Sequence, residues 1–233
     1  MSDIILTHWH HDHVDGLLSL LSLLPSSPRI HKFPSPDHTL DVDTLPLRDG
    51  QEFNLGSTDG SEDATLTVVH TPGHTSDSIS LHLATLSGDE AIFTADTVLG
   101  HGTAVFERLA PYISSLQRLK SLTESPGAPE VVPLYPGHGP VVKDGKRKLQ
   151  EYIEHRAMRE REVFEAVSEA SEKGERVTAD ELVDTIYGPT LPDEVRVAAT
   201  RGLQLILDKL EEEGKIRGDR EKGYTVADSA SKM

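Results

Sequence analysis

Four histidines and one aspartate lie within six consecutive residues near the start of the chain, and this segment constrains the fold more than any other. It reads Thr7-His8-Trp9-His10-His11-Asp12-His13 and directly follows the apolar run Ile4-Ile5-Leu6. A helical pattern of leucines begins at Val14, so the segment is expected in the turn between a strand and a helix. At such a turn His8 and His10 can project to one side. Asp12 and His13 can face a neighbouring point, so the segment predicts ligands for two adjacent metal ions.

Three more candidate ligands each follow a run of strand-forming residues. His74 stands in Thr71-Pro72-Gly73-His74-Thr75-Ser76, Asp96 ends Ile92-Phe93-Thr94-Ala95-Asp96, and His138 stands in Tyr135-Pro136-Gly137-His138-Gly139-Pro140. Pro and Gly favour tight turns that expose the side chain, and a carboxylate at the end of an apolar strand needs a counter-charge, which a metal would provide. The chain has no Cys, so thiolate ligands, disulfides and Cys nucleophiles are excluded.

Strand patterns alternate with helical ones over the first part of the chain, which favours an α/β sandwich. Strands are expected over 4–6, 64–69, 79–83, 91–95 and 131–135, helices over 14–24 and 110–122, and a connection rich in Pro and Ser over 25–38. A second unit is expected to comprise a long charged helix over 146–173, helices over 179–186 and 194–213, and a two-strand wing over 215–226. We therefore predict a catalytic domain over 1–145 and a winged-helix-like module over 146–233.

The charge of the chain argues against nucleic acid as the partner. The whole chain has 23 Lys+Arg and 39 Asp+Glu, a net of −16, and residues 1–145 hold 7 basic and 19 acidic residues, a net of −12. Such a surface repels phosphate backbones at long range, and the run Glu211-Glu212-Glu213 acidifies the helix that would have to enter a groove. No apolar run approaches the roughly 18 residues of a membrane span, so a soluble, cytoplasmic protein without a membrane partner is expected.

Together these residues resemble the signature of the metallo-β-lactamase superfamily, which has a Thr-His-x-His-x-Asp-His loop, a later Gly-His, an Asp at a strand end and a final Gly-His. The resemblance covers residues 4–140 and implies an αββα sandwich that holds two zinc ions. By position, the resemblance assigns His8, His10 and His74 to the first zinc. It assigns Asp12, His13 and His138 to the second zinc, and Asp96 to both. Manganese or iron stays open as the metal.

Within the superfamily, residues 94–107, the loop 135–140, residues 152–156 and the tail resemble the β-lactamase-like protein 2 branch. That branch implies hydrolysis of ester bonds by a metal-bridging hydroxide, with Asp12 and Asp96 as catalytic residues that orient it. The favoured substrate is a thioester or ester, either a small molecule or bound to a carrier protein, such as a polyketide of secondary metabolism. Two alternatives stay open: a single-strand endoribonuclease of the same branch, and an inactive binding protein.

The position of the first motif departs from the family pattern. In the family this motif follows several strands and a helix, whereas here it begins at residue 8, so most of the N-terminal sheet is expected to be missing. The uncovered face would include residues such as Ile5, Val68 and Ile92, and would favour poor solubility, a homodimer or weak zinc binding. A longer N-terminus would also leave room for a mitochondrial targeting signal. Asp15, where the family usually has Gly, is expected to face solvent.

Overall fold

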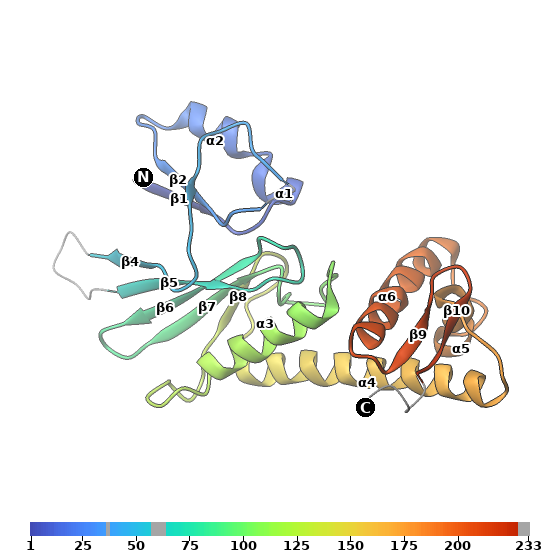
Figure 1. The fold of residues 1–233 in the computed structure, drawn as a ribbon. Helices are drawn as coiled ribbons and strands as arrows, with labels where there is room; N and C mark the ends of the chain where they lie inside the picture. Colours follow the sequence, from blue (N-terminus) through green and yellow to red (C-terminus); the bar gives the residue numbers. More distant parts are fainter. Residues whose placement is uncertain (36–37, 57–63, 228–233) are drawn as a thin grey trace, which may run out of the picture. The chain divides into compact units, whose positions relative to one another are not determined.

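The computed structural model describes residues 1–35, 38–56 and 64–227 (Figure 1). Contacts divide the chain into two compact units, Met1–Ile153 and Glu154–Met233. Helix α4 (Gly145–Glu172) begins in the first unit, close to the predicted start of the second domain, and ends in the second unit. None of the helices in the described ranges is long and apolar enough to cross a membrane.

The first sheet carries the histidine-rich segment. Strands β1 (Asp3–Leu6), β2 (Arg29–Lys32) and β3 (Leu45–Pro46) pair in that order and run parallel. Helices α1 (His11–Val14) and α2 (Leu17–Leu23) form the crossover from β1 to β2. One face of this sheet is buried through the cluster Leu6, Val14, Leu17 and Ile30.

Strand β2 lies inside the segment 25–38 that the sequence predicts as a connection, so this prediction is wrong for residues 29–32. The strand Arg-Ile-His-Lys has a single aliphatic residue, and its pairing with β1 depends on residues far away in the sequence. Residues 36–37 of the same segment lie outside the described ranges.

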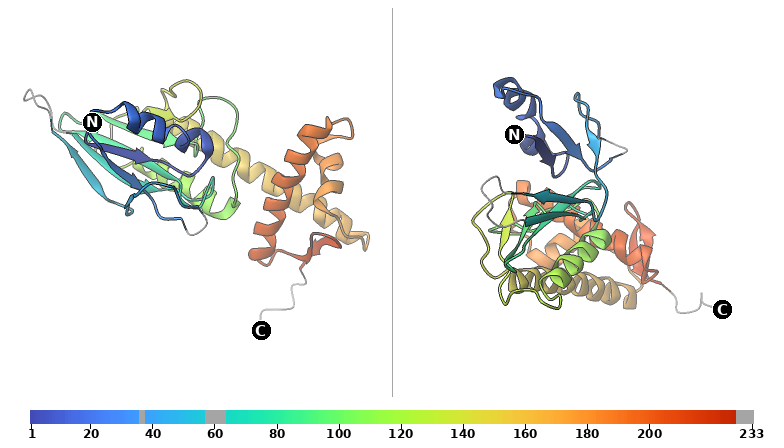
Figure 2. Two further views of the ribbon diagram at one scale, coloured as in Figure 1. Left: turned by 90° about the horizontal axis from the view of Figure 1, so that it is seen from above. Right: turned by 90° about the vertical axis from the view of Figure 1, so that its left-hand side faces the viewer.

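The second sheet supplies the other candidate ligands. Among the described residues its strand order is β4 (Glu52–Leu55), β5 (Ala64–His70), β6 (Ile79–Thr85), β7 (Glu90–Ala95) and β8 (Leu134–Pro136). Neighbouring strands are antiparallel, except that β7 and β8 are parallel and are connected through helix α3 (Leu109–Leu122). Helix α3 and the start of α4 lie on the face turned away from the first sheet, as Figures 1 and 2 show.

The two sheets pack through their inner faces. Leu47, Val68, Ile79 and Leu81 are buried together, and Ile5 and Phe33 of the first layer pack against them. The order of layers is therefore helix, sheet, sheet, helix, as the sequence predicts.

The predicted exposure of the inner face needs a correction. Val68 and Ile92 are 0% exposed. Val68 lies under Leu47, and Ile92 lies on the opposite face of the sheet, beside Leu134. The inner face is instead open at β7 and β8, where the stacked rings of Phe93 and Tyr135 are 38% and 40% exposed.

The second unit has the arrangement of a winged helix. Helices α5 (Ala179–Tyr187) and α6 (Asp193–Glu212) are followed by the antiparallel strands β9 (Ile216–Asp219) and β10 (Gly223–Val226). Thr178 caps α5, because its side chain accepts from the backbone N–H of Glu181 while the Glu181 carboxylate accepts from the backbone N–H of Thr178. The apolar side chains Leu182, Leu203 and Leu207 are fully buried in this unit.

Candidate metal centre

The candidate ligands leave their strands at one edge of the two sheets. Strands β5, β7 and β8 run in the same direction, so His74, Asp96 and His138 follow strand ends at the same edge. The backbone N–H of Ile79 donates to the carbonyl of Thr7 over 3.0 Å, which brings the loop after β1 to that edge. The structure thus brings all seven predicted residues together.

These residues form two groups of different burial. We call His8, His10, His74 and Asp96 the buried set, and Asp12, His13 and His138 the open set. In each set the residues offer one ligand atom apiece, and these atoms lie within 4.8 Å of one another. His8 and His74 are 1% and 3% exposed. In the open set the side chains of His138 and Asp12 are 45% and 57% exposed.

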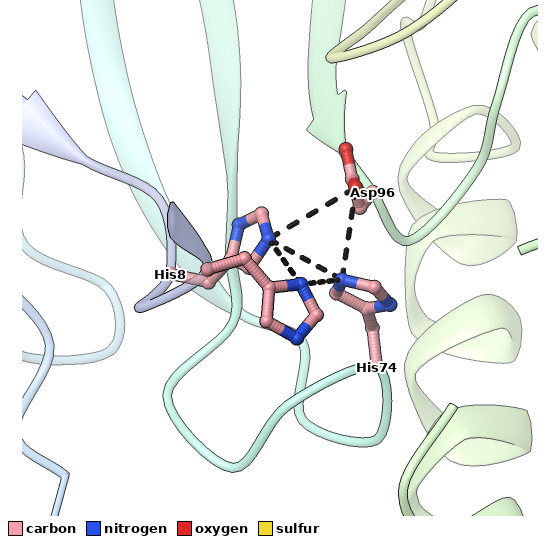
Figure 3. Close-up of side chains that lie close together, drawn as sticks. His8, His74 and Asp96 are labelled. Carbon is pink, nitrogen blue, oxygen red and sulfur yellow. Dashed lines mark hydrogen bonds and ion pairs between the residues drawn. The ribbon is translucent and has the colours of Figure 1, made fainter. Parts of the chain in front are cut away.

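Three imidazole nitrogens of the buried set lie in a close triangle. Nε2 of His74 is 3.3 Å from Nε2 of His8 and 3.0 Å from Nδ1 of His10, and the latter two atoms are 3.2 Å apart. Figure 3 shows His8, His74 and Asp96 pointing toward one another. In the open set, Nε2 of His138 lies 3.3 Å from Nε2 of His13 and 3.0 Å from Oδ2 of Asp12. Imidazole nitrogen and carboxylate oxygen are donors that zinc takes in catalytic sites.

Asp96 stands between the two sets. Its Oδ2 lies 3.7 Å from Nε2 of His74 and 3.4 Å from Nε2 of His138, and its Oδ1 lies 3.4 Å from Nε2 of His13. Oδ1 is buried, yet within the described residues it accepts no hydrogen bond. A buried carboxylate oxygen without a donor is costly, and a cation shared between the two sets would satisfy it. The residues present therefore fit a pair of metal ions.

Burial keeps two histidines of the buried set, His8 and His10, free of protons at neutral pH. Burial, and then the neighbouring imidazoles, lowers the pKa of His8 to about 2. Burial and the imidazole of His74 also lower the pKa of His10. For Asp12, burial raises the pKa, but the hydrogen bond from its own backbone and the imidazoles of His13 and His138 outweigh this, so the pKa lies below its ordinary value. At neutral pH, His8 and His10 offer lone pairs and Asp12 offers a negative charge.

Contacts behind the ligands orient them. Nδ1 of His74 donates to the carbonyl of Val105 over 2.8 Å, which leaves Nε2 as the atom that faces the site. The hydroxyl of Thr7 lies 3.1 Å from Nδ1 of His8, so Nε2 of His8 likewise faces the site.

The backbone beside Asp96 is also specialised. Ala95 has φ 46°, which is rare for a residue with a Cβ, and its carbonyl accepts from the backbone N–H of Gly137 over 2.8 Å. A Cβ on Gly137 would lie 2.5 Å from Oδ1 of Asp96 and 2.9 Å from Cε1 of His13. Gly137 is therefore glycine because the ligands approach its backbone closely.

The remaining polar residues near the motif stay outside the two sets. His11 and Asp15 pair with each other over 3.2 Å, with side chains that are 83% and 68% exposed, so Asp15 faces solvent as expected. Trp9 stacks on His38 with ring centroids 3.7 Å apart. His101 is exposed, and its Nδ1 is close to the backbone of Gly139.

Sequence reasoning missed the residues that support the ligands from behind. Lys32 and Asp77 form a buried ion pair next to the His74 loop. The hydroxyl of Tyr152 accepts from the backbone N–H of Leu99 and donates to the carbonyl of Gly102, both over 3.1 Å. An Asp between Ser76 and Ser78 at the start of an apolar strand is a weak signal in the sequence, and nothing local pairs it with Lys32.

Comparison with known proteins accounts for both units. Residues 2–138 match the family model of the metallo-beta-lactamase superfamily, and residues 178–223 match the beta-lactamase associated winged helix domain. The beta-lactamase-like protein 2 homolog of Drosophila melanogaster is 34% identical over 92% of the chain, and the chain covers 70% of that protein. An atrochrysone carboxyl ACP thioesterase of Aspergillus novofumigatus is 35% identical over 94% of the chain, which spans 64% of the fungal protein's length.

A solved structure shows the same architecture. The beta-lactamase domain protein from Burkholderia ambifaria superposes with a TM-score of 0.76 over 97% of this chain and 74% of that chain, at 17% identity. At this identity the likeness concerns the fold alone. The layers and the winged helix described above are therefore shared with known proteins.

Proposed function

Because the chain belongs to the metallo-β-lactamase superfamily, we propose that it is a di-zinc hydrolase that cleaves a thioester, such as an acyl group bound to a carrier protein. The observation that carries the metal part of the proposal is Asp96, a carboxylate between the two sets whose buried Oδ1 accepts no hydrogen bond from the described residues. The thioester part is supported by the relatives, among which fungal proteins of about 35% identity are named ACP thioesterases.

In this proposal each set holds one metal. Nε2 of His8, Nδ1 of His10 and Nε2 of His74 face the first position, and Asp12, His13 and His138 face the second. Asp96 would serve both positions, because its Oδ2 lies near both His74 and His138 and its Oδ1 lies near His13. When bound, two zinc ions supply an activated water at neutral pH and polarise the carbonyl that it attacks.

Two aspartates of the chain have separate roles, one in accepting protons and the other in aligning the attacking oxygen. The Asp12 carboxylate is exposed at the open set, and its lowered pKa keeps it ionised at neutral pH, so it can accept a proton from water that reaches the site. Asp96 is buried between the two sets, so it would align the attacking oxygen but is poorly placed to exchange protons with solvent. Because the open set meets solvent, we place the entry of the acyl group there.

The charge of the chain favours an acyl substrate over RNA. Residues 1–145 carry a net charge of −12, and cleavage of RNA would require that this surface attract a polyanion. A neutral thioester carbonyl meets no such barrier. The relatives called beta-lactamase-like protein 2 homologs leave the substrate open in their names, so the two chemistries are separated by experiment.

The test uses the whole chain, loaded with zinc and freed of excess metal. It is offered an acyl-pantetheine thioester in one arm and a single-stranded RNA oligonucleotide in the other, each with and without a chelator. We expect thioester hydrolysis that the chelator abolishes. RNA cleavage alone would assign the endoribonuclease, and two bound zinc ions without turnover in either arm would assign a binding protein.

A further inference from the structure

A buried lysine and a buried aspartate join the two sheets behind the buried set. Lys32 is the last residue of β2, and Asp77 lies in the loop between β5 and β6. Their side chains are 6% and 0% exposed, and Nζ of Lys32 is paired with Oδ2 of Asp77. Within the described ranges Asp77 has no other ion pair. Two charges removed from water in this way hold each other in place, because each is the counter-charge of the other.

Asp77 organises the loop that presents His74. Its Oδ1 accepts from the hydroxyl of Thr75 over 2.7 Å, and the backbone N–H of Thr75 donates to Oγ of Ser78 over 3.2 Å. The backbone N–H of Gly73 in turn donates to the carbonyl of Thr75 over 3.0 Å. The residues on both sides of His74 are thus held by a hydrogen-bond network that the Asp77 carboxylate joins through Thr75.

Lys32 connects this network to the strand that carries His8. In the parallel pairing of β1 with β2, Lys32 lies opposite Leu6, two residues before His8. The ion pair therefore links the element that ends in His8 to the loop that ends in His74. Between these two histidines the Nε2 atoms are only 3.3 Å apart, so a small shift of either loop changes the donor geometry of the buried set.

We propose that Lys32 and Asp77 are positioning residues, whose ion pair fixes the His74 loop against the first sheet and so sets the metal affinity of the buried set. The inference rests on the proposed metal-binding role of His74. Neither residue belongs to the two sets of ligands. Partners behind the ligands of a metal site typically change its affinity by about 10- to 100-fold.

The first experiment needs no metal. Amide hydrogen exchange is measured on the metal-free whole chain for the wild type, for Asp77→Asn, and for the double variant Lys32→Met/Asp77→Asn, which leaves no lone buried charge and keeps a carbonyl for Thr75. Asp3→Asn is the matched control, because Asp3 pairs with His31 over 2.8 Å on the same two strands, at the end of β1 far from His8. We expect faster exchange at Gly73 and Thr75 in both Asp77 variants and unchanged exchange there in the control.

The second experiment titrates zinc against a chromophoric chelator and records the absorption of the cobalt-loaded protein. We expect a loss of about 10- to 100-fold in affinity at the buried set for both Asp77 variants, a changed cobalt spectrum, and an unchanged affinity at the open set. A general loss of stability would weaken both sets alike. Wild-type exchange and wild-type affinity in the double variant would overturn the positioning role. If the wild type takes up no zinc, the proposed function fails, while the exchange result still decides whether the pair positions the loop.

Discussion

The two ligand sets meet at Asp96, a member of the buried set that also lies beside the open set, but they differ in how the fold supports them. In the buried set, the outer nitrogens of His8 and His74 contact Thr7 and the carbonyl of Val105, and both residues are nearly inaccessible. In the open set, within the described residues, neither His13 nor His138 has a hydrogen bond from its outer nitrogen, and the side chains of Asp12 and His138 are about half exposed.

This difference separates two tasks within one site. A buried, oriented set holds a metal tightly because its ligands lose little freedom on binding. An exposed set leaves room for a substrate and exchanges water readily. We therefore expect unequal metal affinities, with the higher affinity at the buried set, and the following changes test that inequality.

The largest effect is expected from His74→Ala. Zinc sites are held by about 10–16 kcal/mol in total, so one of four ligands corresponds to roughly 3 kcal/mol, or about a 100-fold rise in Kd. We expect loss of the tighter zinc, measured by competition titration and metal analysis. His138→Ala is the comparison, and it should remove the weaker zinc while the tighter one changes by less than about threefold. Equal losses in both variants would show that the two sets bind as one unit.

Gly137→Ala should disturb both sets at once. The added Cβ would meet Oδ1 of Asp96 and Cε1 of His13, so we expect zinc affinity to fall by about 10- to 100-fold at both positions. Gly16→Ala is the control, since a Cβ there meets nothing within 4 Å and its φ is −74°. Wild-type zinc binding in Gly137→Ala would mean that the backbone near Asp96 moves enough to accommodate the added Cβ.

As the pH is lowered, stability should be lost first through His8 of the buried set and only later through Asp12. Folding holds the pKa of His8 near 2, so below its ordinary value of 6.5 the unfolded chain binds a proton that the folded chain refuses. The free energy of unfolding of the metal-free protein should therefore decrease as the pH is lowered. From His8 alone the decrease should be about 2 kcal/mol between pH 6.5 and pH 5. Asp12 has a lowered pKa, so its stabilising charge is lost only below its ordinary value of 3.8.

Urea denaturation with a chelator present, at pH 7, 6 and 5, measures this dependence. His8→Asn should flatten the loss of stability between pH 6.5 and 5. An unchanged slope in that variant would place the acid-sensitive group elsewhere.

The smallest effect is expected at Asp15, which lies next to the open set in sequence but faces solvent. Its pair with His11 is highly exposed, so Asp15→Asn should change the free energy of unfolding by less than about 0.5 kcal/mol. Zinc affinity at both positions should stay as in the wild type. A clear gain or loss of zinc affinity at the open set would show that the Asp15 charge does affect metal binding there.

The sequence allows the approach of the seven candidate ligands to be predicted because they follow strand patterns, four of them in one turn and the other three each in a separate turn. Their common edge then follows from the direction of β5, β7 and β8. Whether they bind zinc stays a prediction. Most strands and helices were predictable for the same reason, since their periodicity is local.

What the sequence does not reveal are relations between distant residues. Strand β2 has a weak pattern and becomes a strand through its pairing with β1. Lys32 and Asp77 are 45 residues apart and meet only when the sheets pack. The face on which Ile92 lies is set by its register against His82, which no local pattern contains.

His13 and His138 are 125 residues apart in the chain, and this distance orders the assembly of the site during synthesis. A nascent chain that has reached residue 96 already contains every ligand of the buried set, whereas the open set is complete only after residue 138. Synthesis proceeds at about 5–20 residues per second, so the second position becomes available several seconds after the first. A shortened chain that stops between residues 96 and 138 would contain the four residues of the buried set but lack His138 of the open set.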